Sequence, residues 1–83
     1  MLLHLGGNIS ILKEEIIGIF DYEAINSDIS KEFLDIARNE KRIIEINSIE
    51  KNKSIVILKD KIFISPISSL TLQKRTVELL ISN

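Results

Sequence analysis

The 83-residue chain is too short for two ordinary domains, and its 45% hydrophobic and 28% charged residues are typical of a globular domain, which excludes a wholly disordered chain. It has no cysteine, so a disulfide framework and a thiolate metal site are both excluded, and small domains without either often gain stability by associating. The net charge of −1 taken alone argues against a nucleic-acid partner, though only weakly. Residues 1–83 are predicted to form one domain.

The first third of the chain is typical of strands. Met1 to Leu5 and Asn8 to Leu12 are short runs that favour β structure, and Gly6-Gly7 between them can supply the positive φ angles of a tight hairpin. Ile16 to Phe20 is apolar on both faces and predicts a third strand, interrupted by Gly18, where another backbone or side chain can approach closely.

A helix of about three turns is predicted next. Ile25, Ile29, Phe33 and Ile36-Ala37 recur at helical spacing, which predicts that they form the buried face. Ser27 can cap the start of this helix.

Two further strands and a second helix follow. Arg42 to Asn47 predicts a strand, and Ser54–Leu58 with Ile62–Ser65 predicts a second hairpin around Lys59-Asp60-Lys61, because Asp in a short polar break is typical of a turn. Pro66 cannot donate to a ladder and should end that strand.

The last segment predicts a helix that Ser68 or Ser69 can cap. Leu70, Val77, Leu80 and Ile81 are predicted to share its apolar face. The predicted fold class is α+β, a small single domain of about six short, mainly antiparallel strands with two helices.

Charge is distributed unevenly along the chain. Residues 1–37 carry a net charge of −5, residues 38–61 carry +3, and the remainder adds +1. The middle segment could form a basic face on an acidic protein, or its charges could simply solvate loops and strand edges.

We expect a cytoplasmic protein. The run from Met1 to Gly7 lacks the basic start and the long apolar core of a signal peptide. No stretch approaches the roughly 20 apolar residues of a membrane-spanning helix.

The residues that carry enzyme chemistry are sparse, and we predict that the protein is not an enzyme. His4 is the single histidine and is more typical of a structural or surface role, so no metal and no cofactor is predicted. Glu14 and Glu15 are adjacent and should point apart instead of converging on one substrate atom. Gly6-Gly7 lacks the further glycines and the lysine of a phosphate loop. Of the four aromatic residues, Phe33 and Phe63 fall at apolar positions that predict burial, which argues against a base-stacking platform.

Three runs are informative by their order and spacing, namely His4–Gly6, Ile16–Asp21 and above all Ser65–Arg75. In these runs the sequence resembles the RemA/RemB family of bacterial extracellular-matrix regulatory proteins, and its RemB-like members most. The resemblance extends over most of the chain. It implies a cytoplasmic, DNA-binding regulator of biofilm-matrix genes that assembles into a ring of identical subunits, with arginines on the ring surface that grip the DNA backbone.

The resemblance also implies where DNA is contacted. In RemA-like proteins one contacting arginine lies just before the third strand, where Lys13 is the only base here and Glu14 and Glu15 would repel phosphate. A second basic cluster precedes the following hairpin, where Lys51 and Lys53 match it in position. The full set of predicted nucleic-acid-binding residues is Lys51, Lys53, Lys13, Lys41 and Arg42.

Two functions remain open from the sequence. The first is an oligomeric regulator that reads double-stranded DNA through its backbone and shape, since no recognition helix is visible. The alternative is a protein-interaction module that regulates through a related regulator or another protein without binding DNA. A small-molecule sensor or enzyme is disfavoured because no convergent polar cluster is visible.

Overall fold

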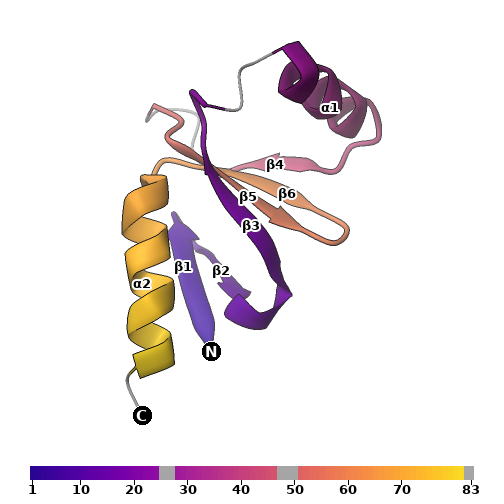
Figure 1. Ribbon diagram of the computed structural model, residues 1–83. Coiled ribbons are helices and arrows are strands. Elements are labelled where there is room, and N and C mark those ends of the chain that lie inside the picture. Colours follow the sequence, from indigo (N-terminus) through magenta and orange to yellow (C-terminus); the bar gives the residue numbers. More distant parts are fainter. Residues whose placement is uncertain (25–27, 47–50, 82–83) are drawn as a thin grey trace.

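The computed structural model of the protein describes residues 1–24, 28–46 and 51–81, which form two sheets and two helices (Figure 1). Strands β1 (Leu2–Gly6) and β2 (Ile9–Leu12) make a two-stranded sheet. A four-stranded sheet has the order β3-β5-β6-β4, with β3 at Ile16–Asp21, β4 at Ile43–Glu45, β5 at Ser54–Leu58 and β6 at Ile62–Ser65. The helices are α1 (Asp28–Asn39) and α2 (Ser69–Ile81). The predicted α+β class is confirmed.

The first hairpin turns at two glycines that adopt positive φ angles, as predicted. Gly6 has φ 109° and Gly7 has φ 53°. A Cβ atom at Gly6 would lie 3.1 Å from Cγ of Pro66, so this glycine also lets the chain after β6 approach the hairpin closely. A single 3-10 turn (η1, Lys13–Glu15) then leads into β3.

Gly6→Ala is expected to lower the free energy of unfolding by about 1–3 kcal/mol, because a side chain at this φ strains the backbone and crowds Pro66. The measurement is urea unfolding followed by circular dichroism. Gly7→Asn is the matched control, since its φ of 53° lies in the left-handed region that Asn tolerates. An equal loss of unfolding free energy in the two variants would contradict the specific requirement for glycine at position 6.

The four-stranded sheet is built around the second hairpin. β5 pairs antiparallel with both β3 and β6, so that Val56 lies opposite Ile19 on one side and Phe63 on the other. β4 is parallel to β6 and is shorter than the predicted strand, whose last residue, Asn47, lies outside the described residues. β6 ends at Ser65, immediately before Pro66, as predicted.

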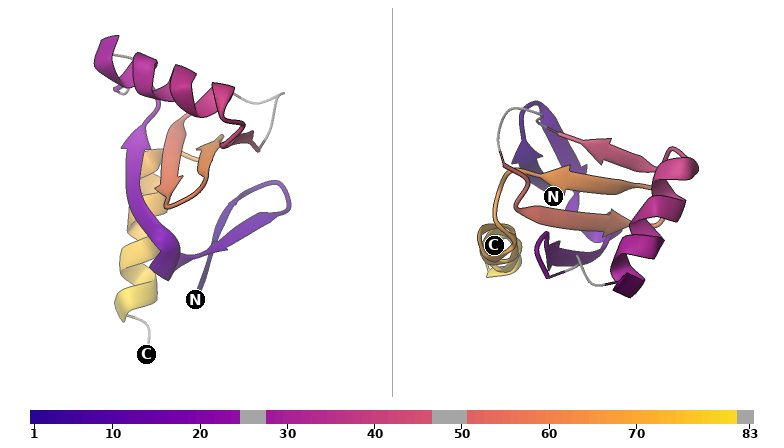
Figure 2. Two further views of the ribbon diagram at one scale, coloured as in Figure 1. Left: turned by 90° about the vertical axis from the view of Figure 1, so that its right-hand side faces the viewer. Right: turned by 90° about the horizontal axis from the view of Figure 1, so that it is seen from above.

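The two faces of this sheet are covered by different elements. Figure 2 shows α1 on one face, and both the first hairpin and α2 on the opposite face. Alternate residues of a strand point to opposite faces. On the α1 face, Ile55 and Ile62 pack with Leu34 and Ala37. On the opposite face, one buried cluster joins the sheet to the hairpin and α2, and its members are Leu3, Leu5, Ile11, Val56, Leu58, Phe63 and Leu72.

The predicted buried face of α1 is partly wrong. Ala37 is fully buried as predicted, but its buried neighbour is Leu34, whereas Phe33 and Ile36 remain 41% and 49% exposed. The physical reason is that Phe33, Leu34, Ile36 and Ala37 together form an apolar arc wider than the part of the helix that meets the sheet. Predicted residues Ile25 and Ser27 lie outside the described part of the chain.

In α2, Leu70 and Val77 do share a face, but this face is turned to solvent and not to the core. Leu72 is fully buried, while Leu70 and Val77 are 77% and 51% exposed. The helix begins as predicted, because Ser68 Oγ accepts a hydrogen bond from the backbone N–H of Thr71 at 3.2 Å. Leu72 packs in the buried cluster with Leu3 and Leu5 of β1. The structure does not describe the side chains of Leu80 and Ile81.

Candidate nucleic-acid interface

Lys51 and Lys53 lie on the connection that enters β5, and both side chains are exposed. The backbone of Lys53 is held on both sides: its N–H donates to the carbonyl oxygen of Ser65 at 2.9 Å, and its carbonyl accepts from the N–H of Tyr22 at 3.1 Å. Lys51 Nζ lies 3.6 Å from Glu23 Oε1 in an exposed ion pair, which contributes little to stability. The connection therefore presents two lysines to solvent, and the backbone of Lys53 is held by hydrogen bonds on both sides.

Lys41 and Arg42 lie at the opposite end of the sheet, where α1 ends. The N–H of Lys41 donates to Arg38 O and the N–H of Arg42 donates to Ala37 O, both at 3.0 Å, which is the hydrogen-bond pattern of a Schellman cap. Lys41 has φ 59° at the cap position that glycine usually occupies. Arg42 Nε is 2.8 Å from Glu40 Oε2, although its N–H does not point at that oxygen.

Two further lysines, Lys59 and Lys61, belong to the β5–β6 turn, and Lys61 immediately precedes Ile62, which is hydrogen-bonded to Arg42. Parallel pairing of β4 with β6 brings the carbonyl of Arg42 within 2.9 Å of the N–H of Ile62, so the β5–β6 turn that carries Lys59 and Lys61 adjoins this end of α1. We call Lys41, Arg42, Lys59 and Lys61 the β4-end cluster. Only the parallel pairing brings its two halves together, and no local pattern in the sequence signals that pairing.

Lys13 belongs to neither group. It is half-buried in η1 at the start of β3, while Lys53 adjoins the far end of β3, and a six-residue strand spans about 20 Å. The neighbouring Glu14 carboxylate accepts a hydrogen bond from its own backbone amide and lies 3.2 Å from the N-terminal ammonium, and both lower the pKa of Glu14. Because this carboxylate stays charged, the surroundings of Lys13 disfavour phosphate.

Histidine and carboxylate side chains are the groups from which a metal or catalytic site could be built. His4 is exposed and its Nε2 lies 3.0 Å from the carbonyl oxygen of Gly7, so it closes the first hairpin, in keeping with a structural role. No cluster of three or more His, Asp or Glu side chains suited to a metal occurs among the described residues. Within the same ranges, neither helix has the length and apolar character needed to cross a membrane.

These features define a class of protein, a small α+β domain with exposed bases on two short connections at opposite ends of one sheet. Residues 2–76 match the family model RemA-like, described as extracellular matrix regulatory protein A-like. The chain is also similar to extracellular matrix regulatory protein B of Bacillus subtilis (strain 168), with 40% identity over 75 residues that cover 90% of this chain and 89% of that protein. The chain therefore belongs to the RemA-like family, and the resemblance noted in the sequence is confirmed.

Proposed function

We propose that this protein is a cytoplasmic transcriptional regulator of extracellular-matrix genes, and that it binds duplex DNA as a homo-oligomer, in the form of a ring. Membership of the RemA-like family supports the regulatory role. The observation that carries DNA binding is the position of Lys51 and Lys53, two exposed lysines on the connection into β5, in which the backbone of Lys53 is hydrogen-bonded to both neighbouring segments.

The proposed contact is to the DNA backbone. Lysine meets phosphate as a point charge and needs no aromatic platform, so binding of this kind carries little base specificity. One subunit offers few such lysines, and the attraction of each to phosphate is weakened by salt. A homo-oligomer repeats the same lysines at fixed spacing, and simultaneous engagement raises the overall affinity far above that of one subunit.

The double variant Lys51→Ala/Lys53→Ala is expected to weaken duplex binding about equally across DNA sequences. It should also make the dependence of log affinity on log salt shallower, by about 0.9 for each phosphate that is no longer neutralised. The measurement is fluorescence anisotropy of a labelled duplex at low and near-physiological salt. Titration of Lys41→Ala/Arg42→Ala under the same conditions compares the contribution of the β4-end cluster to duplex affinity with that of Lys51 and Lys53.

Lys31→Ala/Arg75→Ala is the matched control, because it removes the same charge from exposed positions on the two helices, outside the predicted set. This control should bind with nearly wild-type affinity. An unchanged affinity and salt slope in Lys51→Ala/Lys53→Ala would remove both lysines from the DNA contact.

A protein-interaction module is the second candidate, and the outer face of α1 favours it. Phe33 and Ile36 are exposed there, and the exposed acids Glu32 and Glu40 belong to the same segment. An apolar surface next to carboxylates suits a basic partner protein. A stoichiometric partner of this chain, together with no DNA binding even at low salt, would favour this candidate.

A further inference from the structure

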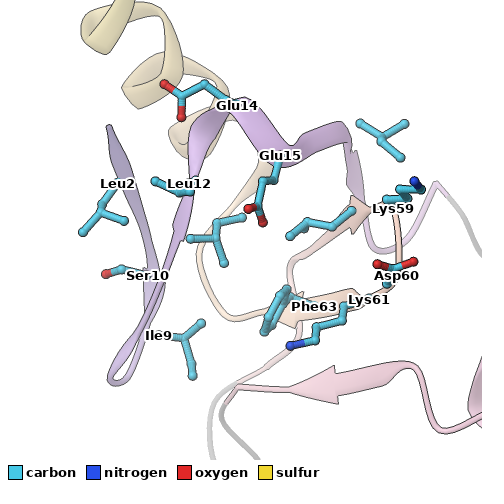
Figure 3. A pocket seen from close by; sticks show the side chains of 13 residues that line it. Leu2, Ile9, Ser10, Leu12, Glu14, Glu15, Lys59, Asp60, Lys61 and Phe63 are labelled. Carbon is cyan, nitrogen blue, oxygen red and sulfur yellow. The ribbon is translucent and has the colours of Figure 1, made fainter.

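An open groove of about 940 Å³ runs between the first hairpin and the β5–β6 hairpin (Figure 3). One wall comes from β1, β2 and η1, and the other comes from the ends of β5 and β6. The lining residues are Leu2, Ile9, Ser10, Ile11, Leu12, Glu14, Glu15, Ile17, Leu58, Lys59, Asp60, Lys61 and Phe63. Apolar side chains predominate, and charged residues lie only in η1 and in the β5–β6 turn.

Several of these apolar side chains remain in water. Leu2 and Leu12 are cross-strand neighbours in the hairpin, and they are 63% and 45% exposed. Ile17, at the start of β3, is 69% exposed. Large apolar side chains gathered in one groove and left this exposed are typical of an interaction site.

The charge of the η1 wall restricts what the groove can accept. Glu14 is paired with the N-terminal ammonium, whereas Glu15 is in no ion pair within the described part of the chain. Figure 3 shows the Glu15 carboxylate between the two walls of the groove. An apolar occupant with a cation opposite Glu15 would therefore fit this wall. The β5–β6 turn adds Lys59, Asp60 and Lys61 at the other wall.

The outer face of α2 matches that requirement. Leu70 and Val77 are exposed and seven residues apart, which separates them by about 10 Å along the helix axis. Lys74 is exposed and lies between them at a spacing of i+4 from Leu70, so it shares their face. The outer face of α1 does not match, because the exposed Ile36 there has Glu32 as its neighbour one helical turn earlier, and this carboxylate would repel Glu15.

None of the residues that line the groove belongs to α2, so the groove and the outer face of α2 are two different surfaces of the subunit. We propose that the groove of one subunit receives the Leu70–Lys74–Val77 face of α2 from a second copy of this chain. Because two different surfaces meet, the contact is head-to-tail and repeats from copy to copy, closing into a ring or continuing as a filament. This inference rests on the self-association in the proposed function and names the surfaces that carry it.

The test is the mass of the assembly, measured by size-exclusion chromatography with multi-angle light scattering. Leu70→Asp breaks the helix face and Ile17→Asp breaks the groove, and each variant alone should be monomeric. Both side chains are largely exposed, so the fold should persist, which circular dichroism checks. Ile36→Asp is the matched control, an equally drastic change of an exposed apolar residue on α1, and it should assemble as the wild type does.

Mixing the two broken variants gives the decisive result. Leu70→Asp keeps its groove and Ile17→Asp keeps its helix face, so one intact contact can form between them. The mixture should therefore yield dimers that contain one subunit of each variant. Glu15→Lys should likewise weaken assembly of a single chain, and adding Lys74→Glu to it should restore assembly. A mixture that stays monomeric would overturn the head-to-tail contact.

The remaining outcomes separate this inference from the proposed function. A wild type that assembles while both variants keep its mass overturns the named surfaces and leaves self-association and DNA binding intact. Loss of assembly in Ile36→Asp would move the contact to α1 and also overturn the proposal. A wild type that is monomeric at every concentration overturns self-association itself, and the anisotropy titration then tests DNA binding separately.

Discussion

Replacing Leu72 by Ala is expected to lower the free energy of unfolding by about 3 kcal/mol, the usual cost of emptying a buried leucine site. Leu72 is fully buried and is the residue through which α2 enters the cluster that holds Leu3, Leu5 and Phe63. A domain of this size has about 4–12 kcal/mol of stability in total, at the usual value per residue. The variant should therefore have a much lower urea midpoint or be partly unfolded in water.

The matched control for this prediction is Leu70→Ala, the same substitution two residues earlier on the same helix. Because Leu70 is 77% exposed, its truncation should change the free energy of unfolding by about 0.5 kcal/mol or less. Both variants should be made in the Ile17→Asp background, so that a change in assembly does not enter the comparison. A larger loss for Leu70→Ala would show that α2 buries the face that the sequence pattern favoured.

Most of the strands could be predicted from the sequence because their signals are local. Apolar runs rich in β-branched residues mark β5 and β6, a polar break marks the turn between them, and Pro66 marks the end of β6. The two glycines of the first hairpin are a comparably local signal. In each case the residues that specify the element lie inside it or next to it.

The buried faces of the helices could not be predicted in the same way. In α2, Leu70 and Val77 form one apolar face and Leu72 lies on the opposite side, so helical periodicity alone admits two rotations. The choice is made by a tertiary contact, the packing of Leu72 in the buried cluster with Leu3 and Leu5. The same ambiguity in α1 explains why periodicity favoured Phe33 for the core in place of Leu34.

The candidate site was predictable to a similar degree. The exposure of Lys51 and Lys53 follows from their place in a polar connector, and the unfavourable surroundings of Lys13 follow from Glu14 and Glu15. The β4-end cluster depends on parallel pairing between strands separated by the whole of β5, which local sequence does not encode. DNA contact through either group of bases stays a prediction.

Ser65→Ala is expected to cost about 3 kcal/mol, a large effect for the loss of a single oxygen atom. Ser65 is fully buried, and its Oγ donates to the carbonyl of Leu5 at 2.6 Å and accepts from the N–H of Ile67 at 3.1 Å. The variant leaves two backbone groups without their partner, and each such group costs about 1–3 kcal/mol when buried. Urea unfolding measures the loss.

Ser54→Ala provides the comparison, because Ser54 lies directly opposite Ser65 in the sheet and is equally buried. Ser54 Oγ makes a single hydrogen bond, which it donates to the carbonyl of Ile67 at 2.7 Å. The loss of stability in Ser54→Ala should therefore be about half that in Ser65→Ala. Equal losses would mean that the bond to Leu5 contributes nothing. The predicted difference would instead show that Ser65 joins the first hairpin to β6. The backbone carbonyl of Ser65, the last of β6, also accepts the hydrogen bond from the N–H of Lys53.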